Sequence, residues 1–404
     1  MENFYNFQKN QINKGRQLLI ENIQLLLYKQ NSNIFEVLDY ENDLIYTEPL
    51  LFAFFNASNL DFHELNIILK GYKDNVRGEL AVYTNKEGRI YLPNYGWLIT
   101  TQSKTQLLLK LEERIAVDLK SGENINLIFE PIEYMPNSQI ELLKYPIELL
   151  YQCYYDSFGN LVNVEIEEIT KKHRNHLYLA FDLIKKFIPE HYELIESVTR
   201  KIVVFNVDTH LRNSFATMRA QGIAFFNACQ ENYNEVFFID DIAHQTGHLI
   251  FNALIYNFNY FVKAESDLIL EKIPLPDQSL DTRDIHVIFH ALYTYYTTFI
   301  CLDACLTASV FENHKEHEAL GRVAFYLGKC YHDLNLIENP RDKNNIATNL
   351  FTDEGLIIYN SIKEKFSLMI KKYGPIVKGF NLKDQPYNFN YSTFLKSNPL
   401  NEKI

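Results

Sequence analysis

The stretch that decides the fold is Val236–Asn257, VFFIDDIAHQTGHLIFNALIYN. Apolar residues fill both of its ends, which is typical of a buried helix. The stretch places His244 and His248 four residues apart, so the two imidazoles lie on one helical face, one turn apart. Two histidines at this spacing can bind the same metal ion. The sequence therefore predicts a metal-binding helix at the centre of the fold.

The segment HQTGH differs by one residue from the HExxH motif of zinc proteases, because Gln245 stands where those enzymes carry a catalytic glutamate. That glutamate takes a proton from the metal-bound water, and a neutral glutamine cannot do so. Hydrolysis is therefore disfavoured, although a zinc hydrolase that uses a different base stays an alternative. Oxidation at iron needs no such base, because dioxygen and a cosubstrate supply the oxidising power.

A reactive metal site needs a third ligand and open positions for the substrate. The stretch RDIHVIFHALYTYY carries His286 and His290, again four residues apart. His290 lies deeper in the apolar run and is the predicted third ligand, with a purely structural histidine as the other interpretation. His286 is its neighbour in the pattern, and Glu265 and Asp267 are the carboxylate alternatives, which would give a set of two histidines and one carboxylate.

Composition narrows the class of protein. The chain has 404 residues, 47% hydrophobic and 22% charged, as expected for a soluble globular protein. Its net charge of −12 opposes binding to nucleic acid or to a membrane surface, since phosphates would be repelled. The N-terminal segment lacks an apolar signal core, and the five cysteines form no CxxC pair. We therefore expect a cytoplasmic protein with reduced thiols.

The hydrophobic pattern predicts an α+β fold that is predominantly α-helical, with a helical metal-site core and a few short strands. Helices are predicted over 8–30, 45–72, 146–188, 236–257, 284–311 and 317–336. Strands are predicted within 79–100, on both sides of a turn at 85–88, and over 125–132, 201–208 and 223–226. A proline-marked loop follows over 273–281, and the tail from Pro386 is expected to pack loosely.

Three regions follow from this pattern. Residues 1–150 form an N-terminal α+β region of unknown role, 151–345 a helical core with the HxxxH metal site, and 346–404 a C-terminal helix and extended tail.

The segments HQTGHLIFNAL and DTRDIHVIFHALYTYYTTF resemble the HExxH-motif proteins found with ribosomally made, modified peptides. The segment RNSFATMRAQGIAFFNA is similar to the strand region that precedes the motif in that family. The resemblance covers roughly residues 195–340, and Gln245 is the departure from the family pattern. It implies an Fe(II)- and 2-oxoglutarate-dependent hydroxylase that acts on a peptide or an amino-acid side chain, with three histidines as metal ligands and no further catalytic residue. The resemblance also implies a fold that is not a cupin or jelly roll. A non-catalytic relative that binds a peptide or a partner, with a vestigial metal site, is the alternative.

A 2-oxoglutarate site needs a cation for the distal carboxylate, and the planar fork of arginine suits it. Arg322 interrupts the apolar stretch LGRVAFYLG and is the first candidate, with Arg283 second; a structural salt bridge is the competing interpretation for both. His210, Asn213 and Ser214 are the candidates for substrate contacts, although Asn213 or Ser214 could instead cap a helix.

Overall fold

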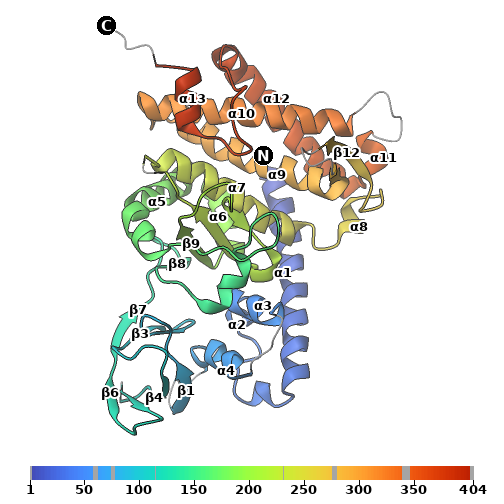
Figure 1. Cartoon of the computed structure of the whole chain (residues 1–404). Helices are drawn as coiled ribbons and strands as arrows, with labels where there is room; N and C mark the ends of the chain where they lie inside the picture. Colours follow the sequence, from blue (N-terminus) through green and yellow to red (C-terminus); the bar gives the residue numbers. More distant parts are fainter. Residues whose placement is uncertain are drawn as a thin grey trace. The chain divides into compact units, whose positions relative to one another are not determined.

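The computed structural model describes residues 2–57, 62–73, 78–113, 115–230, 232–274, 280–338 and 346–400 (Figure 1). The chain divides into two compact units, each assembled from separate stretches. Unit 1 comprises Met1–Gly15, His173–Val198 and Gln230–Ile404, and unit 2 comprises Arg16–Lys172 and Thr199–Cys229. These bounds differ from the predicted boundaries at 150 and 345, because contacts between distant stretches, rather than order along the chain, define each unit.

Unit 1 is mainly helical. Its elements are α6 (Pro189–Val198), α7 (Glu235–Leu254), α8 (Phe258–Phe261), β12 (Ile269–Pro274), β13 (Leu280–Asp284), α9 (Ile285–Thr307), α10 (His314–Ile337), α11 (Ala347–Leu350), α12 (Asp353–Val377) and α13 (Tyr391–Ser397). Two further helices, α1 (Glu2–Gln30) and α5 (Glu167–Phe187), contribute residues to both units. Helix α9 packs on α7, α10 and α12, so it lies at the centre of the unit.

The local sequence explains where the two central helices begin. The side chain of Asn234 accepts a 2.8 Å hydrogen bond from the Val236 N–H and caps α7, while Asp284 accepts one of 2.8 Å from the Val287 N–H and caps α9. Helix α9 is long and apolar enough to span a membrane, but 72% of its most apolar 18-residue stretch is buried inside the protein. None of the five cysteines forms a disulfide.

Most elements predicted for unit 1 are confirmed, the prediction for the tail is wrong, and the loop prediction over 273–281 is wrong at its two ends, which lie in strands. The helices predicted over 236–257, 284–311 and 317–336 correspond to α7, α9 and α10. The segment predicted as a loop over 273–281 is flanked by the antiparallel pair β12 and β13, and its residues 275–279 lie outside the described part. The tail is not loosely packed, because Phe394 of α13 is fully buried and lies where a side chain at Gly321 of α10 would have to go.

Unit 2 contains three small sheets, and the described residues include no closed jelly roll. Its strands are β1 (Glu79–Tyr83), β2 (Arg89–Leu92), β3 (Gly96–Ile99), β4 (Gln106–Lys110), β5 (Ile115–Asp118), β6 (Asn124–Asn126), β7 (Ile128–Pro131), β8 (Glu141–Leu143), β9 (Lys201–Phe205), β10 (Phe215–Ala216) and β11 (Ile223–Asn227). They are ordered β1-β4-β5-β6, β2-β3-β7 and β10-β11-β9-β8. Its short helices are α2 (Asp43–Tyr46), α3 (Pro49–Phe55) and α4 (Phe62–Lys70), with 3-10 turns at Ile34–Glu36, Glu148–Cys153 and Met218–Ala220. The fold is therefore α+β and mostly helical, as predicted.

Strand pairing in unit 2, which the sequence did not predict, separates strands that are neighbours along the chain. The turn at 85–88 joins β1 to β2, but β1 pairs with β4 and β2 pairs with β3, so the two strands belong to different sheets. The strand predicted over 125–132 is divided between β6 and β7, which also lie in different sheets. Within residues 146–188, Glu148–Cys153 is a 3-10 helix, and the chain is α-helical only from α5 onward. The strands predicted at 201–208 and 223–226 are confirmed as β9 and β11, a parallel pair.

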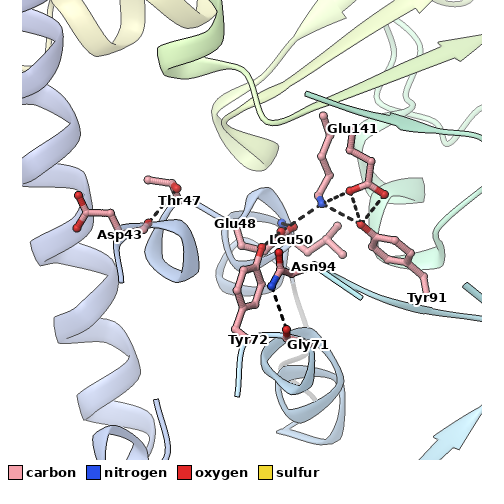
Figure 2. A network of polar contacts seen from close by, with 10 residues as sticks. Asp43, Thr47, Glu48, Leu50, Gly71, Tyr72, Tyr91, Asn94 and Glu141 are labelled. Atoms are coloured by element: carbon pink, nitrogen blue, oxygen red, sulfur yellow. Dashed lines mark hydrogen bonds and ion pairs between the residues drawn. The ribbon is translucent and has the colours of Figure 1, made fainter. Parts of the chain in front are cut away.

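A buried ionic network ties the first residue of β9 to the rest of unit 2 (Figure 2). Lys201 Nζ lies 2.7 Å from Glu141 Oε2 and 3.2 Å from Glu48 Oε2. The hydroxyl of Tyr91 donates to Glu141 at 2.6 Å, and that of Tyr72 donates to Glu48 at 2.6 Å. Burial opposes the charge of Lys201, but the two carboxylates outweigh it and raise the pKa of the lysine. The network is internally satisfied, which fits a structural role.

A candidate metal centre of three histidines

Helix α7 carries a stripe of partly exposed side chains on an otherwise buried surface. All of its residues are buried except His244, His248, Asn252 and Ala253. The first three follow one another at four-residue spacing, so they lie on one face of the helix. The two histidines are therefore partly exposed, while most of α7 forms core.

The approach of α9 brings the third histidine to this face. A Cβ at Gly247 would lie 2.5 Å from Thr297 Oγ1, so glycine permits the close contact of the two helices. Thr297 Oγ1 donates a 2.8 Å hydrogen bond to the carbonyl of Ala243, which fixes α9 against α7. As a result, His290 Nε2 lies 2.8 Å from His248 Nδ1.

His244 lies beside this pair. Its ring centroid is 5.0 Å from that of His248, and its Nδ1 is buried without a hydrogen-bond partner among the described residues. The rings of Tyr326 and Tyr295 lie 5.9 Å and 6.4 Å from the His244 ring. The structure thus brings together the three predicted histidines, two in direct contact and the third one ring away.

The arrangement can be compared with that of metal ligands. Two nitrogens bound at right angles, each about 2.1 Å from an ion, are about 3 Å apart. The 2.8 Å between His248 and His290 is close to this value, and it also suits an N–H···N hydrogen bond between the rings. Within the described ranges, no group of three or more His, Cys, Asp or Glu side chains is placed to hold one ion. As placed, the described residues offer a metal two neighbouring donor nitrogens, those of His248 and His290, and a third ligand would require the His244 ring to move toward them.

Electrostatics keeps all three imidazoles neutral. Burial lowers the pKa of His248 to about 4 and lowers the pKa of His244 and His290 well below the usual range. For His290, the neighbouring imidazoles lower the pKa further. The rings are therefore uncharged at neutral pH and retain the lone pairs with which imidazole binds metals.

The side chain of Gln245 cannot act as a general base. Its side chain is buried, and Nε2 donates a 3.0 Å hydrogen bond to Asp241 Oδ1 one turn earlier in α7. The neutral amide is thus fixed to its own helix. A glutamate at this position would place a second carboxylate beside Asp241.

The alternative ligands lie farther from the pair. The ring of His286 is 5.8 Å from that of His290 and packs against Phe258 at 5.4 Å. Glu265 and Asp267 line a cleft whose lining residues include none of the histidines. Of the predicted ligand candidates, His290 is therefore the one that contacts the α7 histidines most directly.

Arg322 has its charge matched by side chains of the protein. Its guanidinium donates to Asp240 Oδ2 at 2.5 Å and to Glu318 Oε1 at 2.7 Å and 3.0 Å, and all three side chains are buried. Two carboxylates surround one guanidinium, so no net positive charge remains for a cosubstrate carboxylate. This geometry matches the structural salt bridge that was the competing interpretation.

Arg283 is engaged in the same way. It donates to both carboxylate oxygens of Asp333, at 2.8 Å and 2.7 Å, and to Glu271 at 2.9 Å. The second predicted anchor therefore also has its fork occupied.

Sequence reasoning missed Lys329, a cation on the same helix as Arg322. Burial lowers the pKa of Lys329 to about 8, and its positive charge contributes to lowering the pKa of His244. Lys329 Nζ donates to the Tyr387 carbonyl at 2.6 Å and lies over the ring of Phe325, and no carboxylate of the described residues lies within 4.0 Å of it. Lys329 lies seven residues after Arg322, and residues seven apart share a helical face. This spacing could have identified Lys329 from the sequence.

The predicted substrate residues belong to unit 2, whereas the histidines belong to unit 1. Ser214 Oγ accepts a 2.8 Å hydrogen bond from the Asn227 N–H, and the His210 N–H donates to Asp208. No described helix begins at Asn213 or Ser214, so neither is a helix cap. The hydrogen bonds of His210 and Ser214 therefore stabilise the loop between β9 and β10.

Comparison with known proteins gives no relative: no protein-family model matches the chain, and no curated protein matches it. The functional argument therefore depends on the geometry and chemistry of the site.

Proposed function

We propose that the protein is an Fe(II)- and 2-oxoglutarate-dependent oxygenase that hydroxylates a peptide or an amino-acid side chain. The ligands would be His244, His248 and His290. The observation that carries the proposal is the meeting of three neutral imidazoles on α7 and α9, with two donor nitrogens 2.8 Å apart. Imidazole suits iron as well as zinc, so the donor set is compatible with either metal.

The neutral side chain of Gln245 favours oxidation over hydrolysis. Gln245 cannot accept a proton, and its amide is bound to Asp241. Asp240, one turn before His244, is paired with Arg322. Bound iron and 2-oxoglutarate would supply the oxidising chemistry, which requires no general base from the protein.

Lys329 replaces Arg322 and Arg283 in this proposal as the cation for the distal carboxylate of 2-oxoglutarate. Both arginines are already paired with carboxylates, whereas Lys329 is not. A partly buried lysine without a counter-ion destabilises the folded protein, and such groups are frequent at functional sites. An anionic cosubstrate would supply the missing counter-ion.

The first experiment measures metal content and cosubstrate turnover. Anaerobically purified protein loaded with Fe(II) should bind about one iron per chain and form succinate from 2-oxoglutarate. His290→Ala and His248→Ala should lose the metal, whereas His314→Ala, which changes an exposed histidine on α10, should retain it. Zinc binding without succinate formation would favour the hydrolase alternative, and a chain that binds neither metal would favour the non-catalytic peptide-binding alternative.

The second experiment tests Lys329 by Lys329→Met, with the exposed Lys371→Met as the matched control. The variant should lose 2-oxoglutarate binding in calorimetry while keeping its iron. It should also be more stable at pH 7, by about 1–3 kcal/mol, because a pKa lowered from 10.5 to about 8 opposes folding of the charged form.

The pH dependence of that stability gain follows from the direction of the shift. Below pH 8 the lysine is charged in both the folded and the unfolded chain, so the gain is fully present. Between pH 8 and about 10.5 the folded protein loses the proton first and becomes more stable, so the gain from Lys329→Met should vanish over this range. Unchanged 2-oxoglutarate binding in the variant would remove Lys329 from the proposal.

A further inference from the structure

Unit 2 presents a hairpin with two exposed apolar side chains, Phe158 and Leu161. The backbone pairs Tyr155 with Leu161 across an antiparallel bridge, and the turn between them carries Phe158. Leu161 is 72% exposed and Phe158 is 87% exposed. Residues directly opposite in such a bridge have neighbouring side chains, so Leu161 lies beside the Tyr155 ring.

Two arginines from the segment between β9 and β11 meet at the same tyrosine. The guanidinium of Arg212 lies 4.3 Å from the centroid of the Tyr155 ring and 4.0 Å from that of Phe215. The guanidinium of Arg219 lies 5.4 Å from the Tyr155 centroid. We call Tyr155, Leu161, Arg212 and Arg219 the Tyr155 patch. All four residues lie in unit 2.

The charges of this patch are not neutralised by the protein. Among the described residues, no carboxylate lies within 4.0 Å of either guanidinium, and the buried Nε of Arg212 has no hydrogen-bond partner. The nearby carboxylates are used locally, because Asp156 accepts from N–H groups of its own turn and Asp208 accepts from the His210 N–H. The chain as a whole carries a net charge of −12, so the positive charge of this patch is opposite in sign to that of the chain.

The rings also limit the motion of Arg212. A guanidinium stacked on aromatic rings keeps its N–H edge available for an acceptor in the ring plane and gives up little side-chain entropy when it binds. Carboxylates are the peptide groups that match this fork in two parallel hydrogen bonds. The apolar side chain of Leu161 next to it suits an aliphatic or aromatic side chain of the same partner.

We infer that the Tyr155 patch binds an acidic peptide segment in which carboxylates alternate with apolar side chains. The carboxylates would pair with Arg212 and Arg219, and an apolar side chain would pack on Leu161 and Tyr155. The inference concerns unit 2 alone and stands whether or not the histidines of unit 1 bind a metal.

The test uses the full chain and a short fluorescein-labelled peptide in which Glu alternates with Leu and Phe, measured by fluorescence anisotropy. Arg212→Gln with Arg219→Gln should weaken binding at least about tenfold, as expected when charged hydrogen bonds are lost. Lys104→Gln with Lys120→Gln removes two exposed charges from the same unit and should leave the affinity unchanged. Arg212 packs against two aromatic rings, so its replacement could disturb the fold. Arg219→Gln alone changes only an exposed side chain and provides a second variant that keeps the fold.

Peptides with Gln or Lys in place of Glu should bind at least about tenfold more weakly, and added salt should weaken binding of the Glu peptide. Equal affinity of the arginine variants, or equal binding of the Lys peptide, would overturn the inference. Displacement of the Glu peptide by single-stranded DNA at similar concentration would also overturn it, since the patch would then recognise phosphates in general.

Discussion

Replacing Arg322 separates its structural role from a role in cosubstrate binding. The side chain makes three charged hydrogen bonds, to Asp240 and Glu318, and all three residues are at most 3% exposed. Arg322→Met would leave two buried carboxylates without a counter-ion. Removing one partner of a buried pair costs about 3–5 kcal/mol, so we expect the melting temperature of unit 1, which has about 200 residues, to fall by about 10 °C.

The assay can distinguish the two units. Trp97 is the only tryptophan of the chain and lies in unit 2, so its fluorescence reports the unfolding of that unit. Far-UV circular dichroism follows the helices, most of which belong to unit 1. We expect the dichroism transition of Arg322→Met to shift while the change in Trp97 fluorescence is smaller.

A second variant checks the cause of the shift. Adding Glu318→Gln and Asp240→Asn to Arg322→Met removes the unpaired charges and should restore most of the lost stability, because neutral groups are cheaper to bury. A melting temperature of Arg322→Met within about 1 °C of the parent, together with loss of 2-oxoglutarate binding, would refute the reasoning and restore the role predicted from the sequence.

Three further predictions concern helix contact, the glutamine and pH. Gly247→Ala should destabilise the protein in a urea titration and weaken metal binding, because the new Cβ would lie 2.5 Å from Thr297 Oγ1. In the same titration, Gly328→Ala, at an open and exposed helical position, should stabilise the protein by about 0.5–1 kcal/mol. Gln245→Glu should lower the melting temperature and create no peptidase activity, since it places a carboxylate beside Asp241; robust peptide hydrolysis would contradict this. Burial raises the pKa of Asp303, but hydrogen bonds from Lys365 and Lys372 outweigh this effect and bring the pKa to about 2. Asp303 should therefore contribute about 2 kcal/mol to the free energy of unfolding above pH 4, and this contribution should be lost as the pH falls toward 2. Asp303→Asn should remove that part of the acid sensitivity, measured by urea titration from pH 2 to about 6.

The sequence predicted the helices of the site well because their signals are local. The four-residue steps from His244 to His248 and from His286 to His290 place each pair on one helical face, and the apolar runs around them indicated burial. The partner of Arg322 was not predicted, because Asp240 is 82 residues away along the chain. Asp240 is four residues before His244, so the same periodicity places it on the histidine face of α7.

Strand pairing was not predicted, for a related reason. The turn after β1 indicates a change of direction, but the partner of β1 is the later strand β4 rather than β2. Alternating apolar residues identify a strand without identifying its neighbour in a sheet. The bounds of the two units escaped prediction because each unit combines stretches that are distant in the sequence.

The interleaving of the two units has a consequence for synthesis of the protein on the ribosome. Unit 2 ends at Cys229, so every residue it needs has been made while α7, α9 and α10 are still to be translated. Unit 1 contains the first fifteen residues of the chain and yet depends on helices near the C-terminus. Its N-terminal segment must therefore wait for most of the chain, and no single truncation point yields unit 1 alone. The histidine pair joins residues from α7 and α9, so it can form only after His290 has been translated.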